Sequence, residues 1–343
     1  MAEIKRQTEL DILRLLATLA VIMIHGGLNP LTDNLMIKYM YRGMHAAIVW
    51  CVPVFFMISG RFFLDPERDV SAKKILTVYL PHIIVPFLVW SGVYTAYGLI
   101  SGSYSHLSTF GVIAEFIHGP YHLWFLYSLA GLYLLTPILR KAAADGKTLA
   151  YFLIMFAAVN VVTQYLIYVP KIGGMISDFI ERTGLRAVTG YMGYFMLGYF
   201  LYSKKDNMSK KTETAIYVIG ILMLIATIAA ECFISEELRK TDFVKQYMKP
   251  NVILYSAAIY TFFVMKMSKI YYSERTRKVF AVFTECGFGV YCIHAILNEF
   301  VPTPVIKSLP FITSLLRVAC LYALSLALTW LIRKIPFVGK KIT

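Results

Sequence analysis

Blocks of about twenty apolar residues recur along almost the whole 343-residue chain, and they limit what it can fold into. A helix of that length, rising about 1.5 Å per residue, crosses a hydrocarbon core of about 30 Å. The chain is 58% hydrophobic and only 16% charged, which excludes an ordinary soluble globule. The sequence therefore predicts an all-α, polytopic integral membrane protein.

Window length predicts about ten transmembrane helices. They span residues 10–28, 45–64, 78–101, 121–140, 148–168, 188–203, 214–233, 250–271, 280–302 and 312–333. The sixth is the weakest, being short and rich in glycine, which suits close packing against neighbouring helices. No connector is long enough for a separate soluble domain, so we expect one transmembrane domain over residues 1–343.

The net charge of +14 lies mostly in short connectors, where it sets the topology. About 21 Lys and Arg residues fall on one side of the predicted helices against about 10 on the other. The richer side should be cytoplasmic, which places both termini inside. Nucleic-acid binding needs a clustered basic face and is not expected. Anionic lipid headgroups are the expected partners of these cations.

The first block, residues 9–28, differs from a plain anchor because it carries Asp11, Arg14 and His25. Ionisable groups inside a spanning helix cost several kcal/mol unless they meet a partner or a polar interior. In a regular α-helix, Arg14 and His25 share one face about 16 Å apart. A buried reaction site is the leading interpretation, with Asp11 orienting Arg14. A purely structural Asp11–Arg14 ion pair fits Arg14 equally well.

Cations gather at the predicted cytoplasmic end of the second helix, which closes with a Ser-Gly-Arg sequence. Guanidinium and ammonium groups bind phosphates in charge-assisted bonds, so this end suits an anionic, phosphate-bearing cofactor. The Ser-Gly pair also fits close helix packing. The candidate cofactor-binding residues are Arg14, Ser59, Gly60, Arg61, Lys73 and Lys74.

Imidazoles gather toward the opposite end. His122 and Trp124 begin the fourth helix, while Tyr291 and His294 lie past the midpoint of the ninth, at a height similar to that of His25. A neutral imidazole is a natural general base for a hydroxyl at neutral pH. We therefore expect these four side chains to bind or orient an acceptor. Trp124 also fits an interfacial aromatic belt.

Other polar residues receive structural interpretations. Tyr121 is assigned to interface packing, and Arg317 to snorkelling toward the outer surface. The five cysteines form no CxxC pair and are interpreted as core residues. No HxxxH, HExxH or carboxylate-rich pattern indicates a metal site.

At these residues the chain resembles the acyltransferase 3 family of bacterial polytopic membrane proteins, which O-acylate surface glycans and other envelope substrates. The strongest element is Arg14, ten residues, then His25, preceded by Leu10 and Asp11. The other matching blocks, in chain order, are FFMISG (55–60), HLWFL (122–126) and GVYCIH (289–294). Within the family, the chain most resembles the surface-polysaccharide branch that contains the enterobacterial common antigen O-acetyltransferase.

The resemblance implies acetyl-coenzyme A as cytoplasmic donor, a hydroxyl of an envelope glycan as acceptor, and the bacterial inner membrane as location. It also implies that His25 is the catalytic histidine and Arg14 its essential partner. The resulting hypothesis is a membrane O-acetyltransferase with a donor site and an acceptor site at opposite ends of one passage. The alternative is a transporter of a small anion or a lipid-linked sugar, because buried Arg and His also suit a proton-coupled path. The sequence leaves the acceptor's identity and a homo-oligomeric state open.

Overall fold

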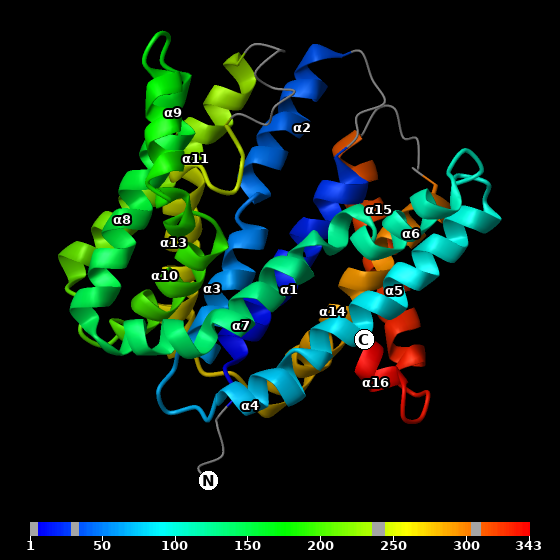
Figure 1. Cartoon of the computed structure of the whole chain (residues 1–343). Helices are drawn as coiled ribbons and strands as arrows, with labels where there is room; N and C mark the ends of the chain where they lie inside the picture. Colours follow the sequence, from blue (N-terminus) through cyan, green and yellow to red (C-terminus); the bar gives the residue numbers. More distant parts are fainter. Residues whose placement is uncertain (1–5, 29–33, 235–243, 303–309) are drawn as a thin grey trace. The chain divides into compact units, whose positions relative to one another are not determined.

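The computed structural model describes residues 6–28, 34–234, 244–302 and 310–343, and these residues contain helices but no strand (Figure 1). The α-helices are α1 (Thr8–Ile22), α2 (Leu35–Ile48), α3 (Cys51–Phe63), α4 (Ala72–Lys74), α5 (Pro81–Ile100), α6 (Thr109–His118), α7 (Trp124–Ala144), α8 (Gly146–Gln164), α9 (Gly173–Arg182), α10 (Tyr191–Ser203), α11 (Lys210–Phe233), α13 (Pro250–Met265), α14 (Glu274–Phe300), α15 (Pro310–Ile332) and α16 (Gly339–Ile342).

Within the described residues, nine helical stretches are long and apolar enough to cross a membrane. This confirms the prediction of an all-α polytopic membrane protein. Nine of the ten predicted segments correspond to these stretches. The predicted sixth segment is α10, which has 13 residues and is shorter than a full span. The side on which the termini lie stays a prediction.

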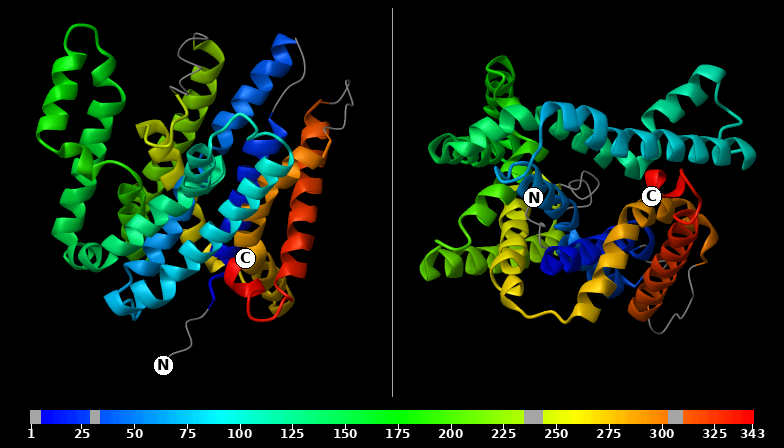
Figure 2. Two further views of the ribbon diagram at one scale, coloured as in Figure 1. Left: turned by 45° about the vertical axis from the view of Figure 1, so that its right-hand side comes forward. Right: turned by 90° about the horizontal axis from the view of Figure 1, so that it is seen from below.

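The chain divides into two compact units, each built from separate pieces of the sequence. The first unit comprises residues 1–24, 28–68 and 138–281. The second comprises residues 25–27, 69–137 and 282–343. Figure 2 shows neighbouring helices within each unit, such as α8 beside α9 in the first and α5 beside α6 in the second. The units interleave along the chain, so neither is a continuous segment.

The first unit has its closest helix packing where α3 meets α10. A methyl group on Gly60 would overlap the backbone carbonyl of Phe195, and one on Gly198 would overlap the backbone of Met57. Only glycine permits this approach, as in the small-residue interfaces of membrane helices. The close packing expected of the glycine-rich segment is confirmed. Helix α1 also packs against α3 in this unit.

The second unit contains α4, α5, α6, the first part of α7, α14 from residue 282 on, α15 and α16, together with the short stretch His25–Gly27. Its C-terminal helix α16 packs against α5, where the indole Nε1 of Trp90 donates a 2.8 Å hydrogen bond to the carbonyl of Ile342. This contact closes the described end of the chain onto the helix that also supplies Tyr94 to the site described below.

Candidate active site

His25 lies in a single π-helical turn, Met23–Gly27, that continues α1. A π-turn has i→i+5 hydrogen bonds, is rare, and occurs frequently at functional sites. The expected shared face of Arg14 and His25 was calculated for a regular α-helix, and it stays a prediction. Arg14 belongs to the first unit and His25 to the second, so each is described with its own unit.

Three histidines of the second unit form an imidazole cluster: His25, His122 and His294. The ring centroids lie 5.3 Å apart for His25 and His294, 5.1 Å for His122 and His294, and 6.5 Å for His25 and His122. They come from the π-turn, from the 3-10 turn Tyr121–Leu123 and from α14. The structure therefore brings together three residues that the sequence predicted for one site.

The three rings differ in how far they are exposed to solvent. His122 is 2% exposed and His294 is 1% exposed, whereas His25 is half-buried. His25 is thus the member of the cluster that a substrate can reach. The other two form a layer behind it and are placed to orient rather than to contact a substrate.

Backbone carbonyls fix which nitrogen of each buried ring carries a proton. The Nδ1 of His294 lies 2.7 Å from the carbonyl of Tyr291, and the Nε2 of His122 lies 3.4 Å from that of Cys292. A carbonyl oxygen only accepts hydrogen bonds, so these nitrogens are the protonated ones in neutral rings. The Nε2 of His294 and the Nδ1 of His122 are then acceptors, both buried and without a partner among the described residues. Buried polar atoms of this kind are rare and often mark function.

Tyr94 of α5 hydrogen-bonds to the backbone of α14 beside His294. Its hydroxyl donates to the carbonyl of Cys292 at 2.9 Å and accepts from the backbone N–H of Ile296 at 2.9 Å. In a regular α-helix these two backbone groups bond to each other directly. The Nε2 of His122 lies 3.4 Å from the same carbonyl of Cys292, so Tyr94 ties α5 to the imidazole cluster.

Two further tyrosines border the imidazole cluster. The hydroxyl of Tyr121 lies 3.2 Å from the Nδ1 of His25, and the two rings stack at 5.1 Å. Tyr291 donates from its hydroxyl to the backbone carbonyl of His122. Tyr291 was predicted from the sequence as a site residue, whereas Tyr121 was assigned to interface packing. Tyr121 directly precedes His122, and this was the sequence feature that could have indicated a place in the site. Trp124 packs edge to face against Phe125.

In the first unit, the Asp11 carboxylate bridges two arginines. The Nη1 of Arg14 lies 2.9 Å from Oδ1 of Asp11, and the Nε of Arg6 lies 2.6 Å from Oδ2. Asp11 is 3% exposed, so the pair is largely withdrawn from solvent on the carboxylate side. The guanidinium of Arg14 also lies over the ring of Phe62 at 5.0 Å. The Asp11–Arg14 ion pair that the sequence left open is present.

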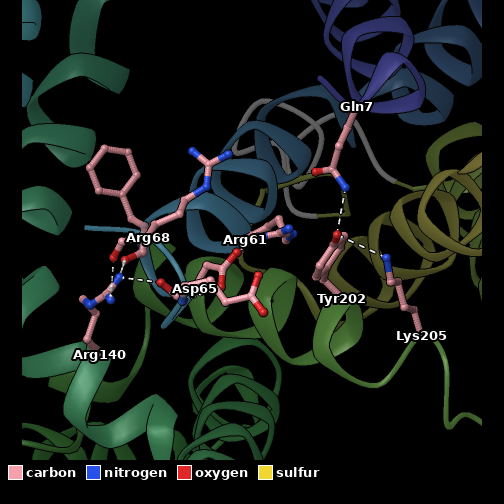
Figure 3. Close-up of polar contacts among 9 residues, drawn as sticks. Gln7, Arg61, Asp65, Arg68, Arg140, Tyr202 and Lys205 are labelled. Carbon is pink, nitrogen blue, oxygen red and sulfur yellow. Dashed lines mark hydrogen bonds and ion pairs between the residues drawn. The ribbon is translucent and has the colours of Figure 1, made fainter. Parts of the chain in front are cut away.

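Arg61 is 8% exposed and lies between a carboxylate and an aromatic ring. Its Nη1 lies 2.5 Å from Oδ2 of Asp65, and its guanidinium stacks 3.4 Å above the ring centroid of Tyr202. The hydroxyl of Tyr202 in turn accepts hydrogen bonds from Gln7 at 2.8 Å and Lys205 at 3.2 Å (Figure 3). This chain of contacts joins α3 to α10 and to the start of α1.

Arg140 caps the end of α3. Its Nη1 donates to the carbonyls of Phe63 and Asp65, both at 2.8 Å, and its Nη2 donates to that of Arg68 at 2.9 Å (Figure 3). Phe63 is the last residue of α3, where a carbonyl has no donor within the helix and a cation is favoured; Asp65 and Arg68 lie in the turn that follows. From the sequence, Arg140 was only one of the connector charges. Its carbonyl partners lie more than seventy residues earlier, so the residues around Arg140 give no sign of this role.

A cavity of about 410 Å³ opens in the first unit, at the start of α1. Its charged lining comprises Arg6, Glu9, Lys205, Asp206, Lys269 and Arg277. Arg6 connects it to the Asp11–Arg14 pair, and Lys205 connects it to Tyr202 and hence to Arg61. Tyr272 also lines it, and burial raises the pKa of this phenol, which keeps it a hydrogen-bond donor. We call this cavity the basic pocket, because four cations face two carboxylates.

A family model described as an acyltransferase domain, acyltransferase 3, matches residues 7–334, nearly the whole chain. The chain belongs to the acyltransferase 3 family. It is therefore a multi-pass membrane acyltransferase. The matched region includes the imidazole cluster and, apart from Arg6, the residues that line the basic pocket. No curated protein and no solved structure gives a significant match.

None of the six predicted cofactor-binding residues of this acyltransferase lines the basic pocket; Arg14 and Arg61 pair with Asp11 and Asp65 instead. Gly60 serves the packing of α3 on α10, and Ser59 precedes it in α3. Lys73 and Lys74 belong to α4 in the second unit, where Lys74 pairs with Asp69 at 2.5 Å. A role in binding a cofactor stays a prediction for all six.

Within the described parts of the acyltransferase, no group of three His, Cys, Asp or Glu residues suits a metal ion. All five cysteines are free, as expected from their spacing, but the interpretation as core residues is wrong for Cys320, which is exposed on α15, and Cys232 is only half-buried.

Proposed function

We propose that this acyltransferase moves an acetyl group from acetyl-coenzyme A, bound on the cytoplasmic side, to a hydroxyl of an envelope glycan, in the inner membrane of a bacterium. The observation that supports a hydroxyl acceptor is the imidazole cluster. It presents one reachable ring, His25, backed by two buried rings whose free nitrogens only accept hydrogen bonds. The resemblance to the surface-polysaccharide branch supports a glycan as the bearer of that hydroxyl.

His25 acts as general base or as transient acyl carrier. As base, it takes the proton of the acceptor hydroxyl while the oxygen attacks the thioester carbonyl. The carbon–sulfur bond then breaks, and the coenzyme A thiolate recovers the proton from the imidazolium. As acyl carrier, the imidazole attacks the thioester carbonyl first, and the coenzyme A thiolate leaves. The acceptor hydroxyl then takes the acetyl group from the imidazole, and its proton passes to the thiolate. His122 and His294 are too buried to reach the acceptor and instead orient His25 through the cluster.

The donor binds in the first unit. Arg14 and Arg61 pair with Asp11 and Asp65, and the basic pocket of the same unit carries four cations against two carboxylates. We place the coenzyme A phosphates there, on Lys205 and its neighbours, in charge-assisted bonds. Arg14 and Arg61 then polarise the thioester carbonyl or stabilise the oxyanion, an effect worth several kcal/mol where water is scarce.

The test is acetyl transfer by purified protein in detergent, with labelled acetyl-coenzyme A and a set of candidate glycans. His25→Ala should lose at least about 100-fold in kcat, the range typical of a lost general base. The matched control is His106→Ala, which removes an exposed imidazole of the same unit. The proposal fails if His25→Ala is folded and transfers acetyl at the wild-type rate, or if no hydroxyl compound accepts acetyl from the wild type.

A further inference from the structure

We infer that Arg317 of α15 is a positioning residue that holds the π-helical turn carrying His25. The inference rests on the proposed function of His25. Arg317 does not simply extend toward the surface, as its place in the sequence suggested. Its Nη1 donates to the carbonyl of Gly26 at 2.7 Å, and its Nη2 donates to those of Asn298 at 3.0 Å and Val301 at 3.1 Å.

The three carbonyls lie at the C-terminal ends of two helices, where no backbone N–H of the same helix is left to donate to them. Gly26 lies in the last turn of the first membrane helix, and Asn298 and Val301 lie at the end of α14. The last four carbonyls of a helix have no donor within it, and the negative end of the helix dipole favours a cation there. A guanidinium presents several donors in a planar fork, so one side chain serves both helix ends at once.

Asn298 adds a second link between the same two elements. Its side-chain Nδ2 donates to the carbonyl of His25 at 3.3 Å. A methyl group on Gly26 would overlap the Oδ1 of Asn298 and the Cδ1 of Leu321, so α14 and α15 approach the turn closely. Both backbone carbonyls at the centre of the π-turn are thus bound by side chains from distant parts of the sequence.

This arrangement sets the spacing of two rings of the imidazole cluster. His25 lies in the clamped turn, and His294 lies four residues before Asn298 on α14. Fixing the two helix ends to each other therefore fixes the 5.3 Å separation of the His25 and His294 rings. Both terminal nitrogens of Arg317 are occupied by backbone carbonyls, so its function is to position His25 and not to bind a substrate.

The test combines hydrogen exchange of the peptide covering residues 22–28 with steady-state kinetics, on Arg317→Gln, Arg317→Lys and a matched control. The control is Arg333→Lys, because Arg333 also donates to backbone carbonyls of the second unit, those of Glu285 at 3.0 Å and Thr343 at 3.3 Å, away from the π-turn. Arg317→Gln should speed exchange in residues 22–28 and lower kcat about 10- to 100-fold, the cost of a displaced catalytic group, with KM for acetyl-coenzyme A unchanged.

Arg317→Lys keeps the charge but not the fork, so it should fall between wild type and Arg317→Gln in both measurements. Arg333→Lys should change neither exchange at 22–28 nor kcat. The inference is overturned if folded Arg317 variants exchange residues 22–28 at the wild-type rate, or no faster than Arg333→Lys. Should Arg317→Gln not fold, Arg317→Lys decides on the same criteria. Faster exchange in a protein whose wild type transfers no acetyl would refute the proposed function and leave the clamp standing.

Discussion

At the scale of single residues, polar side chains and backbone carbonyls of the second unit position the rings of the imidazole cluster. The carbonyl of Cys292 shows this, because it lies within hydrogen-bond reach of both Tyr94 and the Nε2 of His122. Tyr121 meets the one reachable imidazole, that of His25, from the other side. Each contact fixes a ring orientation or a tautomer, and none of them uses the free acceptor nitrogens of the buried rings.

Tyr94→Phe tests this positioning, because it removes one hydroxyl and nothing else. The carbonyl of Cys292, which also contacts His122, and the N–H of Ile296 then each lose their hydrogen bond to Tyr94. We expect kcat to fall about 3- to 10-fold, the worth of one hydrogen bond, without a change in KM for the donor. Tyr97→Phe is the control. Tyr97 lies on α5 like Tyr94, and its hydroxyl donates to Glu299. Equal effects of the two changes would count against a specific role for Tyr94.

The donor site is tested by charge reversal at Lys205, which lines the basic pocket and contacts Tyr202. Lys205→Glu should raise KM for acetyl-coenzyme A about 10-fold or more, because a charge-assisted bond worth about 1.5–3 kcal/mol is lost. Lys210→Glu makes the same charge change at an exposed position outside the pocket and should leave KM unchanged. Identical KM values for both variants would place the donor elsewhere.

At the scale of elements, hydropathy was enough to predict most helices, because a span must bury about twenty residues whatever its neighbours are. It overestimated α10, whose length depends on packing against α3. The π-turn at Met23–Gly27 could not be predicted, since the groups that satisfy its carbonyls, Asn298 and Arg317, lie more than 270 residues away. Nothing in the local sequence distinguishes such a turn from a regular helix end.

The crossing of α3 and α10 gives a prediction about stability. Gly60→Ala should lower the thermal midpoint in detergent, because its methyl group would overlap the backbone carbonyl of Phe195. Overpacking of this kind costs about 1–3 kcal/mol. Gly131→Ala is the control: its added methyl group meets no atom within contact distance, so it should be neutral or slightly stabilising. A Gly60→Ala protein as stable as Gly131→Ala would contradict the packing described for these helices.

At the scale of the whole molecule, the acyltransferase carries its predicted reaction groups in two compact units. The first unit holds the Asp11–Arg14 pair, Arg61 and the basic pocket, and the second holds the imidazole cluster. The depth of polar residues in apolar segments predicted Asp11, Arg14, Arg61 and the three histidines, but not the residues that line the basic pocket. It could not predict Arg140 or Arg317, whose roles depend on carbonyls far away in the chain.

The most direct test of the account is acetyl transfer in sealed vesicles with the protein in one orientation. Labelled acetyl-coenzyme A is supplied on the side of the termini, and the acceptor glycan on the opposite side. We predict that wild-type protein and His106→Ala transfer labelled acetyl ester to the acceptor, and that folded His25→Ala does not. Equal transfer by His25→Ala and wild type would contradict the account.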